Sequence, residues 1–295
     1  MKLTLLLLAV LALATLSACG DDSGSGGAPR VVATTTQAAD LAREVAGDRA
    51  EVSSILKPNS DPHAYEPRAG DVKALARADL VVRSGGEIDE WLEEAQAGAG
   101  SDAPVLTLGE NTREEPHWWQ DPRAAERAVG VLRDGLTKAD AAGKATYAAN
   151  AERYLGELRR LDGAIARCVA TIPPAKRKLV TTHDALGAYA DRYGLEVIAT
   201  VIPSRSTGGQ ASAGETAALV KTIRANDVPA VFAESSVRSD VEDAIAREAG
   251  ARVAPALWAD SLGPKGSSGA SYVSSMEDNT HTIADALGGD LARCP

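Results

Sequence analysis

The chain has 295 residues, a formal net charge of −10 and 44% hydrophobic residues. This length is ample for an apolar core and fits two domains better than one. The acidic balance, without any basic cluster, argues against partners such as nucleic acid or an anionic lipid surface.

The first 29 residues have the composition of an export signal followed by a tether. A lysine follows the first methionine, and Leu3–Leu16 is an uncharged apolar run too short to span a bilayer comfortably, which predicts a signal peptide over residues 1–18. The Leu-Ser-Ala-Cys sequence ending at Cys19 resembles a bacterial lipobox, so we expect Cys19 to carry lipid. The alternative is an ordinary signal with a chance cysteine. Residues 19–29, which are rich in Gly, Ser and Asp, would form a flexible tether.

In the first half of the folded body, short β-rich runs alternate with stretches of helical character. Strands are expected at 31–34, 52–56, 80–82 and 104–108, and helices at 38–46, 71–78 and 88–97. Asp71 is expected to cap the second of these helices, and Asp121-Pro122 to open another, with Asp as N-cap and Pro at the first helical position. This alternation is typical of βαβ units with a parallel sheet, in which ligands bind beyond the carboxyl ends of strands.

A long helix is predicted in the middle of the chain. From Lys144 to about Ile172, apolar or small residues recur in steps of four and three, which forms one continuous helical stripe. Pro173-Pro174 ends it. A coiled-coil partner is the alternative, but the Ala and Tyr content of the stripe favours packing within the chain.

After Pro174 the alternation of strands and helices resumes. Strands are expected at 178–182, 195–202, 229–233 and 252–257, and helices at 185–193, 213–225, 240–249 and 272–287. Ser212 and Glu215 form a capping box before the second of these helices. We therefore expect an α/β fold of two doubly wound domains with parallel-type sheets, joined by one rigid helix. The expected boundaries are 30–143 for the N-terminal domain, 144–173 for the helix and 174–295 for the C-terminal domain.

Three of the four histidines follow turn or strand-end signals. His63 and His117 lie in the proline-flanked motifs Asp61–Pro67 and Pro116–Pro122, and His183 directly follows an apolar run. A lone histidine is more often structural, but histidines presented by separate loops are how a metal site is assembled. His281 lies inside the closing helix, and we interpret it as structural or exposed.

This layout resembles the metal-binding substrate-binding lipoproteins of bacterial ABC transporters, cluster A-I, which take up zinc or manganese. The motifs that carry the resemblance are Asp61–Pro67, Ala78–Val82, Pro116–Pro122 and Val231–Ser236, within a similarity that covers nearly all of the mature chain. The resemblance implies that His63, His117, His183 and Asp260 are the metal ligands. It also implies that the protein captures Zn²⁺ with high affinity between its domains and delivers it to an ABC permease.

Three neutral imidazoles and one carboxylate satisfy a tetrahedral zinc ion and leave no position for a water nucleophile, so we expect no enzymatic activity. Manganese-preferring members of the family usually carry glutamate where His183 stands, which favours zinc here and leaves manganese as the alternative. Zinc members often have a His-rich loop between the first two ligands, but residues 91–115 contain no histidine. A zinc hydrolase would need a His-Glu-x-x-His helix, which is absent from the sequence. For an adhesin the sequence offers no sign for or against.

Glu66 and Glu234 are candidates for orienting ligand imidazoles, and ordinary ion pairing in loops is the alternative. Cys168 and Cys294 form an even pair in an exported chain, which favours a disulfide over two free thiols. We expect a monomer that is lipid-anchored on the outer face of the cytoplasmic membrane. Its expected partners are the permease and its ATPase, with a metallochaperone as a further candidate.

Overall fold

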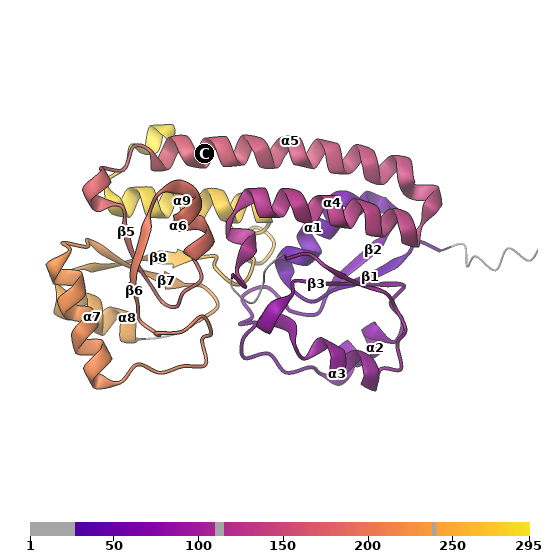
Figure 1. The fold of residues 1–295 in the computed structure, drawn as a ribbon, viewed down its shortest axis with the longest axis horizontal. Coiled ribbons are helices and arrows are strands. Elements are labelled where there is room, and N and C mark those ends of the chain that lie inside the picture. The colour runs from indigo at the N-terminus through magenta and orange to yellow at the C-terminus, as the bar shows by residue number, and fades with distance from the viewer. Residues whose placement is uncertain (1–26, 110–114, 238–239) are drawn as a thin grey trace, which may run out of the picture.

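Two parallel four-stranded sheets lie side by side, and one long helix runs along both of them (Figure 1). The structure is a computed structural model that describes residues 27–109, 115–237 and 240–295. The predicted signal peptide and Cys19 lie outside these residues. Among the described helices, none combines the length and the apolar character needed to cross a membrane.

The first sheet has the strand order β2-β1-β3-β4, with every pair parallel. Its strands are β1 Arg30–Ala33, β2 Glu51–Ser54, β3 Leu80–Arg83 and β4 Val105–Thr107, and its helices are α1 Thr36–Ala46, α2 Ala69–Leu75, α3 Leu92–Gly98 and α4 Pro122–Ala139. The start of α4 is as predicted, because the Asp121 side chain accepts a hydrogen bond from the Arg123 N–H and Pro122 occupies the first turn.

Three helix starts in this half differ from the prediction. Helix α1 begins at Thr36 and not at Ala38, because Thr35 is its N-cap and accepts the Ala38 N–H. Asp71 is not the N-cap of α2; it lies inside the first turn, and its carboxylate accepts the backbone N–H of Arg68, which is the N-cap. The helix expected over 88–97 is instead a 3₁₀ turn, Gly86–Asp89, followed by α3. The reason is that the buried carboxylate of Asp89 accepts the N–H groups of Ser84 and Gly85, and such local bonds compete with a continuous helix.

The second sheet repeats the plan of the first, with the order β6-β5-β7-β8 and every pair parallel. Its strands are β5 Lys178–Thr181, β6 Glu196–Thr200, β7 Ala230–Glu234 and β8 Arg252–Leu257, and its helices are α6 Gly187–Tyr193, α7 Ala213–Ala225, α8 Val241–Ala249 and α9 Tyr272–Leu287. The predicted capping box of Ser212 and Glu215 begins α7. The prediction of two parallel α/β halves is confirmed.

The long helix α5 spans Lys144–Val169. It ends before the predicted Ile172, because the N–H groups of Thr171 and Ile172 bond to carbonyls only three residues back. Its buried stripe is the predicted one: Tyr147, Ala151, Tyr154, Leu158, Leu161, Ile165 and Cys168.

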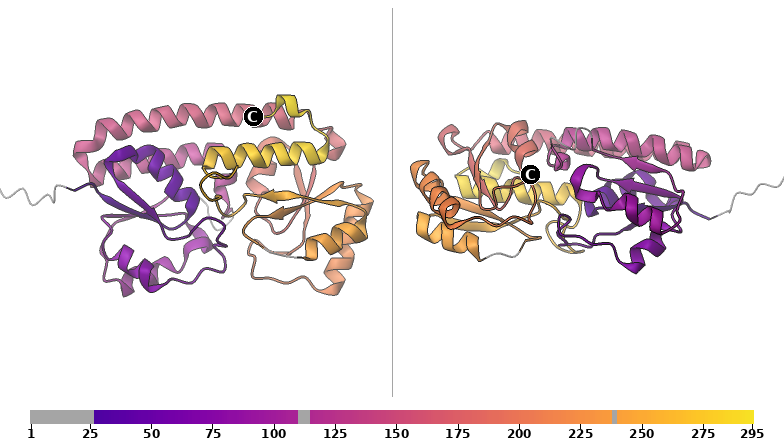
Figure 2. Two further views of the ribbon diagram at one scale, coloured as in Figure 1. Left: turned by 180° about the vertical axis from the view of Figure 1, so that it is seen from behind. Right: turned by 60° about the horizontal axis from the view of Figure 1, so that its bottom comes forward.

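Helix α9 runs alongside α5 and also reaches the first half, where it contacts α1 (Figure 2). The hydroxyl of Tyr272, its first residue, donates to the Trp119 carbonyl at 2.6 Å. One apolar cluster extends from Val31 in the first sheet through Leu158 to Phe232 in the second. The two halves therefore share a core and are not linked by the long helix alone.

A disulfide joins Cys168 near the end of α5 to Cys294 near the C-terminus, across a sequence separation of 126 residues. We expect Cys294→Ser to lower the free energy of unfolding by about 2–5 kcal/mol, because the open chain gains entropy in the unfolded state. Denaturant titration measures this loss. Reductant should lower the stability of the parent to that of the variant and leave the variant unchanged, and equal stability of oxidised parent and variant would contradict the prediction.

Candidate metal centre

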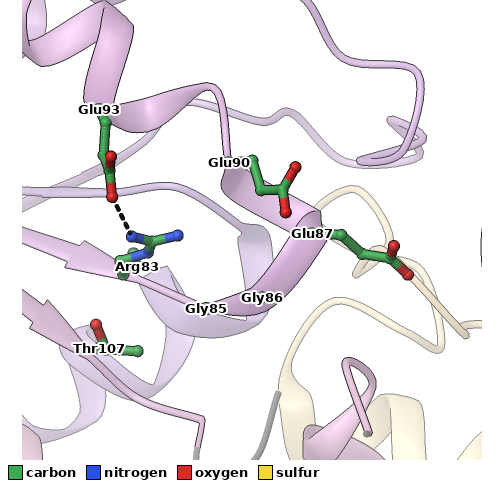
Figure 3. Close-up of a pocket in the computed structure, with 7 residues that line it drawn as sticks. All are labelled: Arg83, Gly85, Gly86, Glu87, Glu90, Glu93 and Thr107. Atoms are coloured by element: carbon green, nitrogen blue, oxygen red, sulfur yellow. Dashed lines mark ion pairs between the residues drawn. The ribbon is translucent and has the colours of Figure 1, made fainter. Parts of the chain in front are cut away.

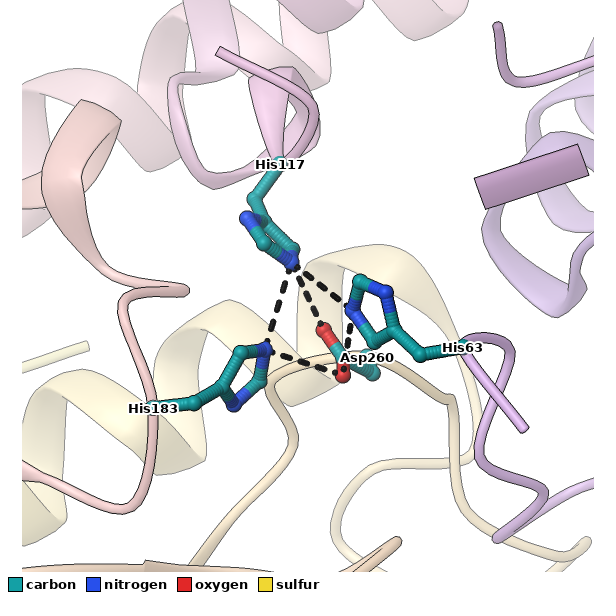
Figure 4. A group of neighbouring side chains, drawn as sticks. All are labelled: His63, His117, His183 and Asp260. Carbon is teal, nitrogen blue, oxygen red and sulfur yellow. Dashed lines mark hydrogen bonds and ion pairs between the residues drawn. The ribbon is translucent and has the colours of Figure 1, made fainter. Parts of the chain in front are cut away.

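Four side chains from four separate segments meet between the halves (Figure 4). His63 lies in the loop after β2, His117 just before the turn that leads into α4, His183 two residues after β5, and Asp260 in the loop after β8. Each half thus contributes two side chains from loops that follow its strands. This is the edge at which parallel α/β sheets bind ligands.

The cluster is compact and directed inward. The Nε2 atom of His117 lies 3.3 Å from the Nε2 atoms of both His63 and His183. The Asp260 carboxylate lies 3.3 Å from the Nε2 atoms of His117 and His183, and 3.4 Å from that of His63. For a tetrahedral zinc site with bonds of about 2.0–2.1 Å, the ligand atoms should be about 3.3–3.4 Å apart, so one ion fits among them.

A cation also satisfies groups that the described residues leave without a partner. Asp260 is 1% exposed, and neither of its oxygens has a hydrogen-bond donor of good geometry in the described parts of the chain. A buried carboxylate needs a counter-charge, and a bound metal ion would supply one. The facing imidazole nitrogens are typical of metal ligands, because neutral imidazoles bind metals through an unprotonated ring nitrogen.

Each of the three histidines has its backbone N–H bound by an acidic side chain. Asp61 accepts from His63 at 2.9 Å, Glu115 from His117 at 3.0 Å, and Glu234 from His183 at 3.1 Å. The roles of Asp61 and Glu115 were not predicted from the sequence. The signal was present in both motifs, which read acid-Pro-His.

Glu234 also contacts the ring of a ligand candidate. Its Oε1 atom lies 2.8 Å from Nδ1 of His183, so a proton on Nδ1 leaves the Nε2 lone pair facing the cluster. Glu234 ends β7, the strand between β5 and β8, which places it beside His183. Glu66, the other candidate for this role, is exposed, and so is His281 on α9.

The loop that carries Asp260 is fixed by the opposite half. Trp119 Nε1 and Gln120 Nε2 both donate to the Ala259 carbonyl at 2.9 Å. The Leu262 N–H donates to the Thr36 hydroxyl, also at 2.9 Å. The indole and amide that follow His117 in the sequence thus position a ligand candidate from the other sheet.

Burial and charge shift the pKa values of the cluster in opposite directions. Burial lowers the pKa of His117 to about 3, which keeps its imidazole neutral. Burial also opposes protonation of His183, but the carboxylates of Asp260 and Glu234 outweigh it and raise the pKa of His183 to about 9. Against the effect of burial, the imidazoles, led by His183, lower the pKa of Asp260 to about 2. Burial also raises the pKa of Glu234, 2.8 Å from the His183 ring, so the pair of His183 and Glu234 favours a bound proton in the metal-free protein.

Metal binding at Nε2 must displace that proton. We expect about one proton to be released from His183 per zinc ion at pH 7.5, and zinc affinity to fall about tenfold per pH unit below pH 9. Calorimetry in buffers of different ionisation enthalpy measures the release. Glu234→Gln is the matched control, because loss of this carboxylate should lower the pKa of His183 and reduce the release. A zinc affinity that is constant between pH 7 and 9 would contradict the assignment.

A hollow of about 730 Å³ lies in the first half, away from the metal cluster, around Arg83 and Thr107 (Figure 3). It is lined by charged groups, of which Arg83 and Glu93 form an ion pair at 3.7 Å. None of its lining residues belongs to the four-residue cluster. The contact distances in that cluster leave space for a single ion and not for an organic molecule.

Each of the two parallel α/β halves supplies two side chains to one cluster of the size of an ion. This is the architecture of a substrate-binding protein for a metal ion. The family model described as "ZnuA: Zinc-uptake complex component A periplasmic" matches residues 31–286. The chain belongs to this family of metal-binding substrate-binding proteins of ABC transporters. The family is a class of solute-binding proteins for metal transport and not a class of enzymes.

The chain is similar to relatives whose names give different metals. The manganese-binding lipoprotein MntA of Bacillus subtilis is 31% identical, over 92% of this chain and 95% of its own length. The iron-binding protein YfeA of Yersinia pestis is 30% identical, over 88% of this chain and 86% of its own. The solved structure of the periplasmic zinc-binding protein TroA from Treponema pallidum superimposes with a TM-score of 0.82 at 27% identity, covering 88% of this chain and 99% of that one.

Proposed function

We propose that this protein binds Zn²⁺ through His63, His117, His183 and Asp260. The observation that supports zinc most strongly is the presence of three imidazole Nε2 atoms and one carboxylate at the spacing of a tetrahedral site. Elemental analysis of protein purified without added metal tests the proposal. About one zinc per chain is expected, and manganese or iron in its place would contradict it.

We further propose that the protein is exported and held at the outer face of the cytoplasmic membrane by lipid on Cys19. From there it would deliver zinc to an ABC permease driven by its ATPase, with a metallochaperone as a candidate zinc donor. Support comes from the lipobox-like sequence and from two relatives, one named a manganese-binding lipoprotein and one a metal ABC transporter substrate-binding lipoprotein. Replacing Cys19 with Ser should release the protein from membranes, which fractionation measures.

Manganese is the second candidate, and one feature of the site favours it. Both oxygens of Asp260 face the histidines, Oδ1 towards His117 and Oδ2 towards His63 and His183. A bidentate carboxylate would give a fifth ligand atom and a harder site, which manganese tolerates better than zinc. Competition between the two ions decides between these candidates.

Metal release should not need a wide hinge opening. The proposed domains 30–143 and 174–295 share one apolar core along α5 and α9, and separating them would expose it. We expect small-angle scattering profiles with and without zinc to superimpose. A marked compaction on zinc binding would contradict this prediction, and the Cys294→Ser variant tests whether the disulfide contributes to the rigidity.

A further inference from the structure

The carboxylate of Asp61 joins the two halves directly beside the metal cluster. Its Oδ1 atom accepts the backbone N–H of His63 at 2.9 Å. Its Oδ2 atom accepts the hydroxyl of Thr207, from the second half, at 2.6 Å. One side chain thus positions a ligand candidate and bonds across the boundary between the halves.

Thr207 belongs to the segment 201–212 between β6 and α7, which is also attached beside His183. The Ile202 N–H donates to the Thr182 carbonyl at 2.7 Å, and the Asp184 N–H donates to the Ser204 carbonyl at 3.1 Å. The segment therefore extends from the residues on either side of His183 to the loop that carries His63. It connects two ligand candidates from different halves through backbone and side-chain hydrogen bonds.

His63 is half-buried as a residue, but its side chain is only 2% exposed, and the side chains of His117, His183 and Asp260 are 0% exposed. All four side chains are therefore closed off from solvent, so an ion can leave only when a segment that carries one of them moves. The His63 loop is the candidate for this movement, because His63 alone among the four has a partly exposed backbone. The hydrogen bonds that hold the His63 loop should therefore control how fast the ion leaves.

We propose that the Thr207–Asp61 hydrogen bond is a latch that slows metal release, and that Asp61 is a positioning residue for His63. The latch acts on the ion through the placement of His63, because neither Asp61 nor Thr207 belongs to the four-residue cluster. This inference rests on the proposed function, namely that the cluster binds zinc.

The experiment measures zinc dissociation from the full chain by rapid mixing with excess chelator. Thr207→Val keeps the shape of the side chain and removes the hydroxyl. We expect it to speed dissociation about tenfold, the effect of one hydrogen bond to a carboxylate that is partly open to solvent, with little change in the association rate. Thr207→Ser should restore the parent rate. Thr216→Val is the matched control, because its hydroxyl bonds only within the start of α7.

Asp61→Ala should speed dissociation more than Thr207→Val, since it also frees the His63 backbone. If the latch acts through Asp61, adding Thr207→Val to Asp61→Ala should have no further effect. The absorption spectrum of bound Co²⁺ should be the same in Thr207→Val and the parent, because the ligands are unchanged.

Dissociation from Thr207→Val within twofold of the parent would overturn the latch, as would additive effects in the double variant. These outcomes leave the proposed function intact, because they require a parent that binds zinc. A parent that does not bind zinc would overturn the proposed function itself.

Discussion

His117→Ala should lower zinc affinity by about 100- to 1,000-fold. Structural zinc sites contribute about 10–16 kcal/mol from four ligands, so one ligand accounts for about 3–4 kcal/mol. His117 is the most central ligand candidate, because its Nε2 atom lies 3.3 Å from each of the other three. Calorimetry or competition with a chelator of known affinity measures the change.

Asp260→Ala should weaken zinc binding by a comparable factor, because it removes the carboxylate of the four-residue cluster. The metal-free variant should also be less stable than the parent, because Asp260 and His183 form a buried ion pair at 3.3 Å and the substitution removes one partner. His281→Ala is the control for both variants, since His281 is exposed on α9. The cluster is not the metal site if His117→Ala binds zinc with an affinity within tenfold of the parent. The same conclusion follows if His281→Ala lowers zinc affinity.

Zinc should raise the melting temperature far more than manganese does. An ion present at about 1,000 times its dissociation constant stabilises the folded state by about 4 kcal/mol, which corresponds to about 7 °C for a chain of this size. Manganese at the same concentration should give a much smaller shift, because the site offers three nitrogen ligands and one carboxylate. Thermal unfolding with each ion, at equal concentration and pH, measures the difference.

The same measurement on a converted site provides the control. His183→Glu replaces an imidazole by a carboxylate, and Glu234→Gln must accompany it, because Glu234 lies 2.8 Å from the His183 ring. In the double variant, the increases in melting temperature caused by zinc and by manganese should differ less than they do in the parent. If manganese stabilises the parent as much as zinc does, the zinc assignment is wrong and the manganese alternative stands.

The fold could be predicted from the sequence because its signals are local. The alternation of short β-rich runs with helical stretches depends on side chains within a few residues of each other, and so does the stripe along Lys144–Val169. The differences at the starts of α2 and α3 also have a local cause. The carboxylates of Asp71 and Asp89 bond to nearby backbone N–H groups, and composition and periodicity do not reveal which N–H group each one selects.

The four candidate ligands were predicted from their motifs and from the family resemblance, and the structure brings all four together. The acidic residues that hydrogen-bond to these ligand candidates were harder to predict from the sequence. Asp61 and Glu115 precede their histidines by two residues, so a local pattern existed to be read. Glu234 could be named from the sequence, but its contact with His183 depends on β7 lying next to β5.

The contacts between the two halves could be seen only in the tertiary structure. The Ala259 carbonyl beside Asp260 receives bonds from Trp119 and Gln120, about 140 residues earlier in the chain, and Thr207 reaches Asp61 across 146 residues. Helix α9, predicted as part of the C-terminal domain, also packs on α1 of the first half. The sequence by itself determined the elements and the residue types at the site, because these depend on neighbours along the chain. The spacing of the Nε2 atoms depends on how two sheets and two long helices pack, and packing becomes visible only when the whole chain is folded.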